Sequence, residues 1–426
     1  MTISRSPNGS KSKGFLLRKE NAPLSSLSKS LRASACMAGV ALAFTAGTAK
    51  ADPAPAPPPP APMTTPAMSA SLSANPAPFS IDLPDWLGFA AGKVYVTGAV
   101  TGLAFSQDNA AHAAPGDVTS LLDMSSGQVF LQKTDGWFQF FVQVGEYSLP
   151  AVGASYIKAS TTTPGTFGVV PQAFIKIAPS DTFSIEAGKL PTLIGGEYTW
   201  SFENINIERG LLWNQENAVN QGVQVNYTAG PIAFSLTAND GMYSNRLNWL
   251  WGSAIWTING ANTLAFIGGG NLGHTGYGKA GTSVALNNED IYNVIYTYSS
   301  GSWMIMPYVQ YTSVPKNLAA GIGSSASTLG GALMASYALN DYWKLAGRVE
   351  YIADTGKAAG SPNLLYGKGS NAWSLTFTPT YQWKQWFIRP EVSYVTAGSA
   401  TPGSEFGPVG TSTDQTRFML ETGVLF

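Results

Sequence analysis

The stretch Arg417–Phe426, RFMLETGVLF, decides the fold of this chain of 426 residues. Its apolar residues recur at every second position, with Thr422 as the exception: Phe418, Leu420, Val424 and Phe426. Between them stand Arg417, Glu421 and Gly423. Because successive side chains of a β-strand point to opposite faces, the stretch predicts a two-faced strand with one apolar side and one side that carries charges.

The composition favours a membrane β-barrel over soluble domains. Only 12% of the residues are charged, which is about half the share of a typical soluble domain. Beyond the N-terminal region the sequence has no apolar run of about 18 residues, the length that a membrane-spanning helix needs. Low charge without a spanning helix predicts a transmembrane antiparallel β-barrel, in which alternation dilutes the apolar residues.

Residues 1–51 are predicted to be a signal peptide. A basic region over residues 1–32 precedes the apolar stretch 33–47 (ASACMAGVALAFTAG), and Ala49-Lys50-Ala51 has the small-x-small pattern of a cleavage site. A short N-terminal membrane anchor is the alternative, but the apolar stretch is shorter than a spanning helix requires. We therefore expect cleavage near Ala51, which also removes the single cysteine, Cys36.

Cleavage would change the charge of the protein. Eight of the 24 Lys and Arg residues lie in residues 1–51, together with one of the 25 acidic residues. The rest of the chain then holds 16 basic and 24 acidic residues, a net charge of −8. No basic patch remains, so no nucleic-acid partner is expected. Residues 52–89 are predicted to be a periplasmic lead, whose Pro-rich part, 52–66, has the composition of a semi-rigid spacer.

From residue 90 to residue 426, two-residue alternation recurs in short runs separated by gaps that are alternately short and long. The short gaps have turn chemistry: 134–136, 179–181, 228–231, 259–262, 299–302, 340–341 and 383–385. The long gaps are polar and rich in Gly, Ser and Asn: 107–126, 149–168, 192–219, 240–246, 272–289, 314–328, 355–370 and 398–413. Seven short and eight long connections predict 16 strands, with short periplasmic turns and long extracellular loops.

Two segments separate their faces most clearly, 342–351 (YWKLAGRVEY) and 386–394 (WFIRPEVSY). A soluble β-sandwich also alternates, but here Tyr and Trp residues gather toward strand ends, as expected at the two interfaces of a membrane. The polar sides of the two segments are predicted to face the lumen: Lys344, Arg348, Glu350, Arg389 and Glu391.

The final strand is expected to pair with the first, within residues 92–105, because an open sheet edge in lipid would leave backbone groups unpaired. Arg417 and Glu421 are then predicted to face the lumen. A last strand that ends in phenylalanine resembles the C-terminal signal by which outer-membrane proteins are recognised for assembly. The residues predicted to face lipid and to form this signal are Phe418, Leu420, Val424 and Phe426.

The longest gap, residues 192–220, is the predicted constriction of the barrel. It carries four carboxylates and one arginine, Arg209. If it folds inward, its carboxylates would oppose lumen-facing basic residues across the lumen, and the transverse field would sort solutes by size and charge. The alternative is a solvated surface loop, but loops this long in compact proteins are usually functional. The opposed sets are Glu197, Glu203, Glu208 and Glu216 on the loop and Lys344, Arg348, Arg389 and Arg417 on the wall.

Residues 185–197 (IEAGKLPTLIGGE) and 204–227 (NINIERGLLWNQENAVNQGVQVNY) resemble the putative β-barrel porin family called OmpL-like. The matching positions are Gly188, Lys189, Pro191, Gly195, Glu197, Arg209, Trp213, Gly222 and Val223. Asn220-Gln221 departs from the His-Thr pair that the family tends to have there. The resemblance implies an outer-membrane porin and supplies no catalytic residues. Resemblance to porins in general implies a homotrimer.

Other classes of function have less support. An enzyme would need a nucleophile and a base that converge, yet the only histidines, His112 and His274, fall in different predicted loops. No catalytic residue, metal site or cofactor is therefore predicted. A structural or surface-interaction barrel with a blocked lumen, acting as an adhesin or receptor, stays open as the alternative, and conductance would separate it from a channel.

The sequence thus predicts an all-β outer-membrane porin through which small hydrophilic solutes, such as ions and sugars, diffuse. The expected partners are outer-membrane lipid, the outer-membrane assembly machinery, the solutes and further copies of the chain in a homotrimer. The residues predicted to line or constrict the pore are Glu197, Glu203, Glu208, Arg209, Glu216, Lys344, Arg348, Glu350, Arg389, Glu391, Arg417 and Glu421.

Overall fold

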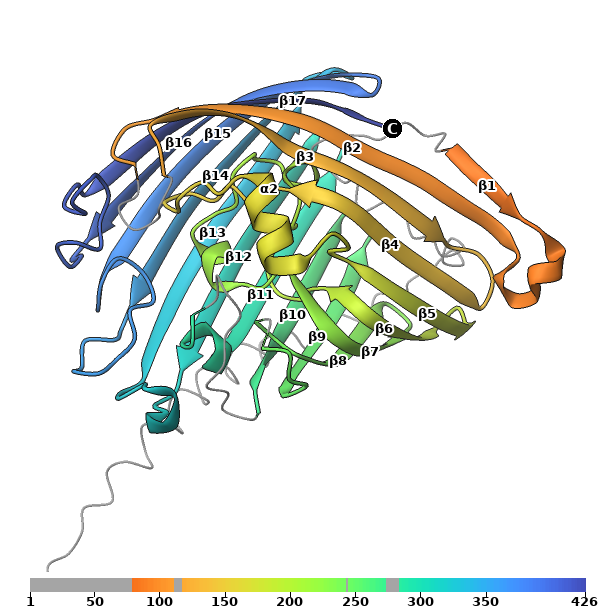
Figure 1. The fold of residues 1–426 in the computed structure, drawn as a ribbon, viewed down its shortest axis with the longest axis horizontal. Helices are drawn as coiled ribbons and strands as arrows, with labels where there is room; N and C mark the ends of the chain where they lie inside the picture. The colour runs from red at the N-terminus through yellow and green to blue at the C-terminus, as the bar shows by residue number, and fades with distance from the viewer. Residues whose placement is uncertain (1–78, 111–116, 243, 273–282) are drawn as a thin grey trace, which may run out of the picture. The chain divides into compact units, whose positions relative to one another are not determined.

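The computed structural model describes residues 79–110, 117–242, 244–272 and 283–426. Strands β2 to β17 form one closed antiparallel barrel (Figure 1), in which each strand pairs with the next and β17 pairs with β2. The predicted 16-stranded barrel is confirmed, and so is the pairing of the final strand with the first. Within the described residues, no helix has the length and apolar character needed to cross a membrane.

The strands of the barrel are 8 to 16 residues long. The first eight of the barrel are β2 (Gly92–Gln107), β3 (Ser120–Lys133), β4 (Phe138–Tyr147), β5 (Ala173–Ser180), β6 (Phe183–Pro191), β7 (Val219–Ala229), β8 (Ile232–Asn239) and β9 (Trp249–Asn259). The other eight are β10 (Asn262–Asn271), β11 (Asp290–Ser300), β12 (Trp303–Val314), β13 (Ala326–Ala338), β14 (Trp343–Asp354), β15 (Asn371–Trp383), β16 (Trp386–Gly398) and β17 (Asp414–Leu425).

Helical turns occur outside these strands. They are η1 (Asp85–Ala90), α2 (Ala159–Thr162), η2 (Thr163–Phe167), η3 (Ser201–Glu203), η4 (Leu212–Gln215), η5 (Leu286–Asn288) and η6 (Leu318–Ala320). Each predicted short gap corresponds to a short turn between neighbouring strands, and each predicted long gap to a longer connection. β3 begins earlier than the predicted gap allows, because a register shift between Thr101 and Leu103 lets Ser120 to Asp123 continue the pairing with β2.

A further strand, β1 (Phe79–Leu83), lies in the predicted periplasmic lead and was not predicted from the sequence. It pairs antiparallel with β2, from Phe79 opposite Val96 to Leu83 opposite Gly92. β17 pairs with β2 only from Ala99 onward. β1 pairs with the earlier part of the same edge of β2, beyond the end of β17. The predicted signal peptide and residues 52–78 lie outside the described residues.

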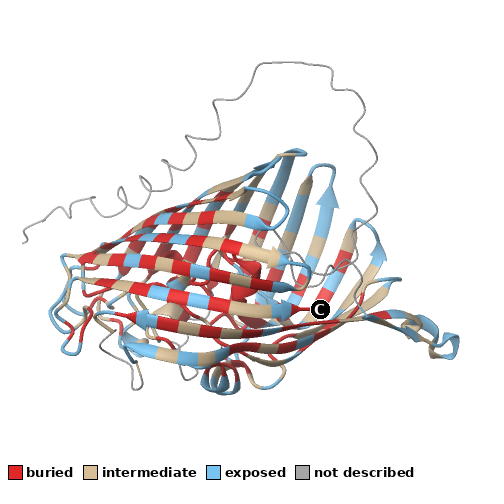
Figure 2. Cartoon of the chain, turned by 90° about the horizontal axis from the view of Figure 1, so that it is seen from above, coloured by how far each residue is buried: buried red, intermediate tan, exposed pale blue. Residues whose placement is uncertain are grey.

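Buried and exposed residues alternate along many of the strands (Figure 2), because successive side chains of a strand point alternately to the lumen and to the outer surface. Arg348 is 1% exposed and its neighbour Val349 is 39% exposed, and Arg417 and Phe418 differ in the same way, at 1% and 60%. This separation matches the faces predicted for these strands. Aromatic pairs lie near the strand ends, as in Tyr351 with Trp373, whose ring centroids are 4.6 Å apart.

The last residue of the chain, Phe426, pairs with Gly98 on β2 where the barrel closes. Gly98 N donates to the carbonyl of Phe426 at 2.7 Å, and Phe426 N donates to the carbonyl of Gly98 at 3.0 Å. A Cβ atom on Gly98 would lie 2.3 Å from Cζ of Phe426 and 2.7 Å from the carbonyl oxygen of Gln128. The closing strand therefore requires a glycine at this position of β2.

We predict that Gly98→Ala lowers the free energy of unfolding by about 1–3 kcal/mol, because the added methyl group displaces the Phe426 ring. Urea unfolding of the refolded protein, followed by tryptophan fluorescence, measures this. Gly102→Ala on the same strand is the matched control, since the nearest atom to its Cβ would be 3.9 Å away. Equal losses in the two variants would contradict a specific role for Gly98.

Candidate functional site: the inner loop and the cavity beside it

Residues 192–218, which we call the inner loop, connect β6 to β7 and contain η3 and η4. Their side chains and backbone bind lumen-facing residues of β11 to β17, which come later in the chain. The wall residues concerned follow a repeated pattern, since Arg348 and Glu350 on β14 recur as Arg389 and Glu391 on β16. The loop is thus attached to the inner wall by charged groups and not by apolar contacts alone.

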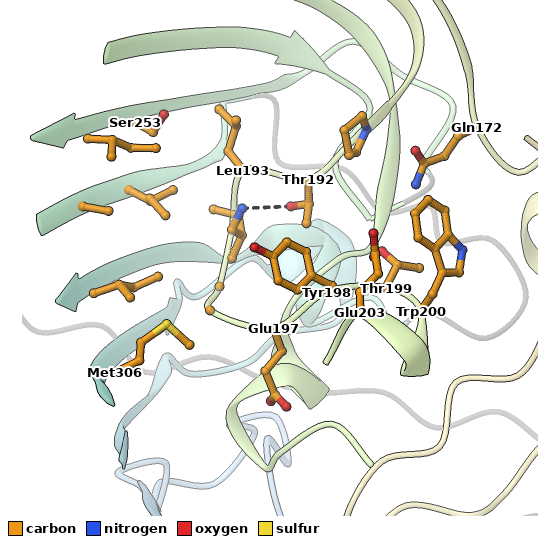
Figure 3. Close-up of a pocket in the computed structure, with 18 of the residues that line it drawn as sticks. Gln172, Thr192, Leu193, Glu197, Tyr198, Thr199, Trp200, Glu203, Ser253 and Met306 are labelled. Atoms are coloured by element: carbon orange, nitrogen blue, oxygen red, sulfur yellow. Dashed lines mark hydrogen bonds between the residues drawn. The ribbon is translucent and has the colours of Figure 1, made fainter. Parts of the chain in front are cut away.

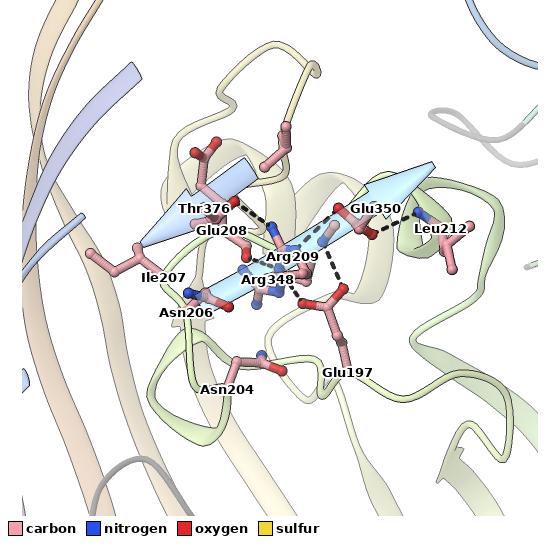
Figure 4. Close-up of polar contacts among 12 residues, drawn as sticks. Glu197, Asn204, Asn206, Ile207, Glu208, Arg209, Leu212, Arg348, Glu350 and Thr376 are labelled. Atoms are coloured by element: carbon pink, nitrogen blue, oxygen red, sulfur yellow. Dashed lines mark hydrogen bonds and ion pairs between the residues drawn. The ribbon is translucent and has the colours of Figure 1, made fainter. Parts of the chain in front are cut away.

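Arg348 is the centre of one attachment (Figure 4). Its Nη1 lies 2.6 Å from Oε1 of Glu197 and also donates to the carbonyl of Glu208 at 2.7 Å, while its Nε lies 3.1 Å from Oε2 of Glu350. All three charged side chains are at most 4% exposed. One wall arginine therefore neutralises a carboxylate of the loop and a carboxylate of its own strand.

The wall carboxylates Glu350 and Glu391 bind the backbone of the inner loop. Each accepts hydrogen bonds from two consecutive amides, so each fixes the direction of the chain as well as its position. The bonds are Leu211 N to Glu350 Oε2 (3.0 Å), Leu212 N to Glu350 Oε1 (3.4 Å), Ile207 N to Glu391 Oε2 (2.5 Å) and Glu208 N to Glu391 Oε1 (2.9 Å).

The remaining wall arginines bind the loop in two ways. Arg417 pairs with the carboxylate of Glu208, which also accepts a hydrogen bond from the Ser393 hydroxyl. Arg389 pairs with Glu421 on the neighbouring strand at 2.5 Å, and its guanidinium donates to two loop carbonyls, those of Ser201 (2.6 Å) and Asn204 (3.0 Å).

The expectation that loop carboxylates and wall arginines oppose each other across the lumen is wrong for Glu197 and Glu208. Both contact their arginines directly, and the ion pairs are buried. Charges in direct contact largely cancel, so they create little field in the open part of the lumen. Lys344 lies four residues before Arg348 on β14, toward the short turn.

Arg209, the loop's own arginine, does not face the open lumen. It is fully buried, and its guanidinium donates to the carbonyls of Thr199, Tyr198 and Pro150. Burial lowers its pKa to about 10. Its role in the structure is to fold the loop on itself and to bind the neighbouring segment that contains Pro150.

The other two loop carboxylates have different surroundings. Glu216 accepts a hydrogen bond from the Tyr308 hydroxyl, and burial raises its pKa to about 8. Burial also raises the pKa of Glu203 well above its usual range, against the opposing effects of the Trp200 backbone amide, which is hydrogen-bonded to it, and of the Arg209 charge. The carboxyl group of Glu216, with a pKa of about 8, is therefore held largely protonated at neutral pH.

A second segment, residues 148–167, also packs inside the barrel and was not predicted to do so. Its Tyr156 hydroxyl donates to Asp123 on β3 at 2.8 Å, and Val152 N donates to the carbonyl of Arg209 at 2.9 Å. Arg417 donates to two of its carbonyls, including that of Ala154 at 2.8 Å. The signal in the sequence is composition, because this long gap has a single charged residue, Lys158, and several apolar ones.

A cavity of about 540 Å³ remains on the other side of the inner loop. Figure 3 shows strand residues such as Ser253 and Met306 on one side and Gln172 and Trp200 on the other, with Tyr198 between them. Of the predicted pore residues, Glu197 and Glu203 line it. The apolar lining residues of β9 to β12 were not predicted: Ile255, Ala265, Ile267, Ile295 and Met306.

Residues 93–426 match the model of the family described as putative beta-barrel porin-2, OmpL-like. This confirms the resemblance seen in residues 185–227. No curated protein matches the sequence significantly.

Three solved structures illustrate the shared fold, each similar over 78% of this chain. An anion-selective porin from Comamonas acidovorans has 13% identity and a TM-score of 0.53 over 99% of its chain. The outer membrane channel DcaP of Acinetobacter baumannii has 11% identity and a TM-score of 0.52 over 97%. The trimer form of OmpT, an outer membrane protein of Vibrio cholerae, has 13% identity and a TM-score of 0.51 over 99%.

We predict that Arg348→Met lowers the free energy of unfolding by about 3–5 kcal/mol, because it leaves the buried carboxylates of Glu197 and Glu350 without their cation. Urea unfolding of the refolded protein measures the loss. Asp341→Asn is the control, since Asp341 lies in an exposed short turn. That change should cost less than about 1 kcal/mol. A loss for Arg348→Met no larger than for the control would show that the buried pair does not hold the loop.

Glu216 should make stability depend on pH. In the unfolded chain its carboxyl group ionises near 4.5, whereas in the folded protein it stays protonated up to about 8. The unfolded chain therefore binds fewer protons in this range, and the contribution of Glu216 is complete below pH 4.5 and is lost as the pH rises to about 8. Glu216→Gln should remove this part of the slope in unfolding free energies measured between these limits. The exposed-turn variant Asp341→Asn should keep it, and an unchanged slope in Glu216→Gln would refute the assignment.

Proposed function

Because the chain belongs to the putative beta-barrel porin-2, OmpL-like family, we propose that it is a diffusion channel for small solutes across an outer membrane. The passage runs beside the inner loop and through the 540 Å³ cavity. This free volume, kept open in a barrel whose opposite side is filled, is the observation that carries the proposal. A barrel of 16 strands is wide enough for an aqueous channel even when loops occupy part of it.

The predicted pore residues divide into two groups in this proposal. Most of them position the inner loop against the wall and set how much of the lumen stays open: Glu197, Glu208, Arg209, Arg348, Glu350, Arg389, Glu391, Arg417 and Glu421. Glu203 lines the passage itself, as Glu197 also does. Glu216 and Lys344 belong to neither group. Selectivity then depends on the lining of the cavity more than on the net charge of the chain.

A barrel with a closed lumen and a structural or surface role is the second candidate. The specific observation in its favour is that two segments, the inner loop and residues 148–167, pack inside the barrel and bind each other through Arg209. Conduction of ions separates the two candidates.

Membership of the family implies a multi-pass barrel in an outer membrane. We extend this to export with cleavage near Ala51, and to recognition of the last strand by the assembly machinery through Phe418, Leu420, Val424 and Phe426. These side chains are 41% to 60% exposed on the outer surface. A homotrimer is the proposed assembly, and the trimer form of the Vibrio cholerae OmpT supports it as a fold-level analogy.

The channel is tested by single-channel current of the refolded protein in a planar bilayer with potassium chloride. We expect discrete current steps. A barrel that is folded by heat-modifiable migration in gels but never conducts would overturn the proposal and favour the closed barrel.

The inner loop is tested in the same bilayers with the double variant Glu197→Gln/Glu208→Gln, which removes both ion pairs between loop and wall. We expect a larger and noisier conductance, because the loop then samples positions away from the wall. Asp341→Asn, in an exposed short turn, is the control and should conduct as the wild type does. The same conductance in all three proteins would show that the loop does not limit the passage.

A further inference from the structure

The inner loop has two chemically different sides. Toward β14 to β17 it presents Glu197 and Glu208 to buried arginines, and its backbone amides to carboxylates. Toward the cavity it presents Leu193, Ile194 and Tyr198. The attachment through charges thus turns an apolar side of the loop toward the open part of the lumen.

The strand wall opposite is also apolar, which departs from the pattern of a porin. Lumen-facing positions of membrane barrels are normally polar, yet Ile255, Ile267, Ile295 and Met306 occupy four of them around the cavity. Ile255 is 41% exposed although it shares a face with the buried Ser253. Ile267 and Ile295 are only 8% and 7% exposed and Met306 is half-buried, so the exposed apolar surface of this wall comes mainly from Ile255. Exposed apolar surface in a cavity of ligand size is a candidate binding site.

The carboxyl groups of two glutamates, Glu197 and Glu203, are the acidic groups at the cavity, and no basic side chain lines it among the described residues. Arg348 already neutralises Glu197. Glu203, by contrast, is bonded to a backbone amide, and Arg209, the cation whose charge acts on it, is fully buried and donates to carbonyls.

We propose that this cavity binds small organic cations with an apolar or aromatic body, on their way through the barrel. The ammonium group would bind the Glu203 carboxylate, and any proton on this carboxyl group leaves to water as the cation arrives. The body would lie between the aliphatic wall of β9 to β12 and the ring of Tyr198, which is 45% exposed and offers a cation–π contact. A cavity of about 540 Å³ is in the size range of small-molecule sites.

An organic anion fits this cavity poorly. It would bring a negative charge beside Glu203 and find no basic side chain among the lining residues. A bare inorganic cation would find the carboxylate but gain nothing from the apolar wall. The carboxyl group therefore selects for a positive charge, and the apolar lining selects for an apolar or aromatic group attached to it.

The inference rests on the proposed channel function, and its test uses the same planar bilayers. The probe is benzylammonium chloride, compared with ammonium chloride and sodium benzoate. We expect benzylammonium to interrupt the potassium chloride current at concentrations where the other two have no effect. Equal effects of ammonium and benzylammonium, or a block by benzoate as strong as that by benzylammonium, would overturn the proposal.

Two variants locate the site. Glu203→Gln can keep the hydrogen bond from Trp200 N but loses the charge, and it should raise the half-blocking concentration of benzylammonium at least about tenfold. Ile255→Thr should raise it about fivefold, through lost apolar contact. The controls are Asp181→Asn in a short turn and Ile185→Thr on the outer surface. Benzylammonium should block both of them at the same concentration as the wild type. An unchanged block in Glu203→Gln would show that the cation binds elsewhere.

Failure of the inference can be told apart from failure of the channel. A protein that conducts potassium chloride but shows no preference for benzylammonium keeps its channel function and loses this site. If the protein does not conduct, the change in tryptophan fluorescence on adding benzylammonium shows whether the binding site exists. A saturable change that Glu203→Gln abolishes would support the site in a closed barrel, and no saturable change would refute it.

Discussion

The position of the inner loop depends on the neutralisation of charges buried inside the barrel. Arg348, Arg389 and Arg417 would be costly to bury alone, and each finds a carboxylate within the wall or the loop. Arg348 and Arg389 also bind carbonyls of the loop backbone, and the neighbouring glutamates Glu350 and Glu391 bind its amides. Because both charge and backbone are satisfied in a single arrangement, the loop is held on one side of the lumen and the cavity stays open on the other.

The barrel was predictable because its signals are local and repeat along the chain. Alternation identified every strand from β2 to β17, and turn residues placed the short connections. The lumen side of Arg348, Glu350, Arg389 and Glu391 followed from the same alternation. β1 was missed because its five residues fall in the segment interpreted as a periplasmic lead, before the alternation recognised from residue 90 onward.

The interior was less predictable because its contacts join residues far apart in the sequence. Which carboxylate contacts which arginine depends on the geometry of the loop, and the sequence does not give that geometry. We therefore expected an electric field across the water-filled lumen, and the structure has direct ion pairs instead. Residues 148–167 resembled other polar gaps despite their low charge. The apolar lumen positions, such as Ile255 and Ile295, fit the alternation of a strand equally well on either face, and only the three-dimensional arrangement shows that they share a cavity.

The seam between β2 and β17 has a consequence for how the barrel is completed. It joins residues far apart along the chain, such as Gln107 and Arg417, which are 310 positions apart. The entropy cost of closing this loop is therefore the largest of any strand pair, and the seam is expected to form late. β1, by contrast, is a near neighbour of β2 in sequence and can pair with it early. β1 pairs with the part of the β2 edge that β17 does not reach. When β17 pairs last, the part of this edge that is still unpaired is therefore about as long as β17 itself.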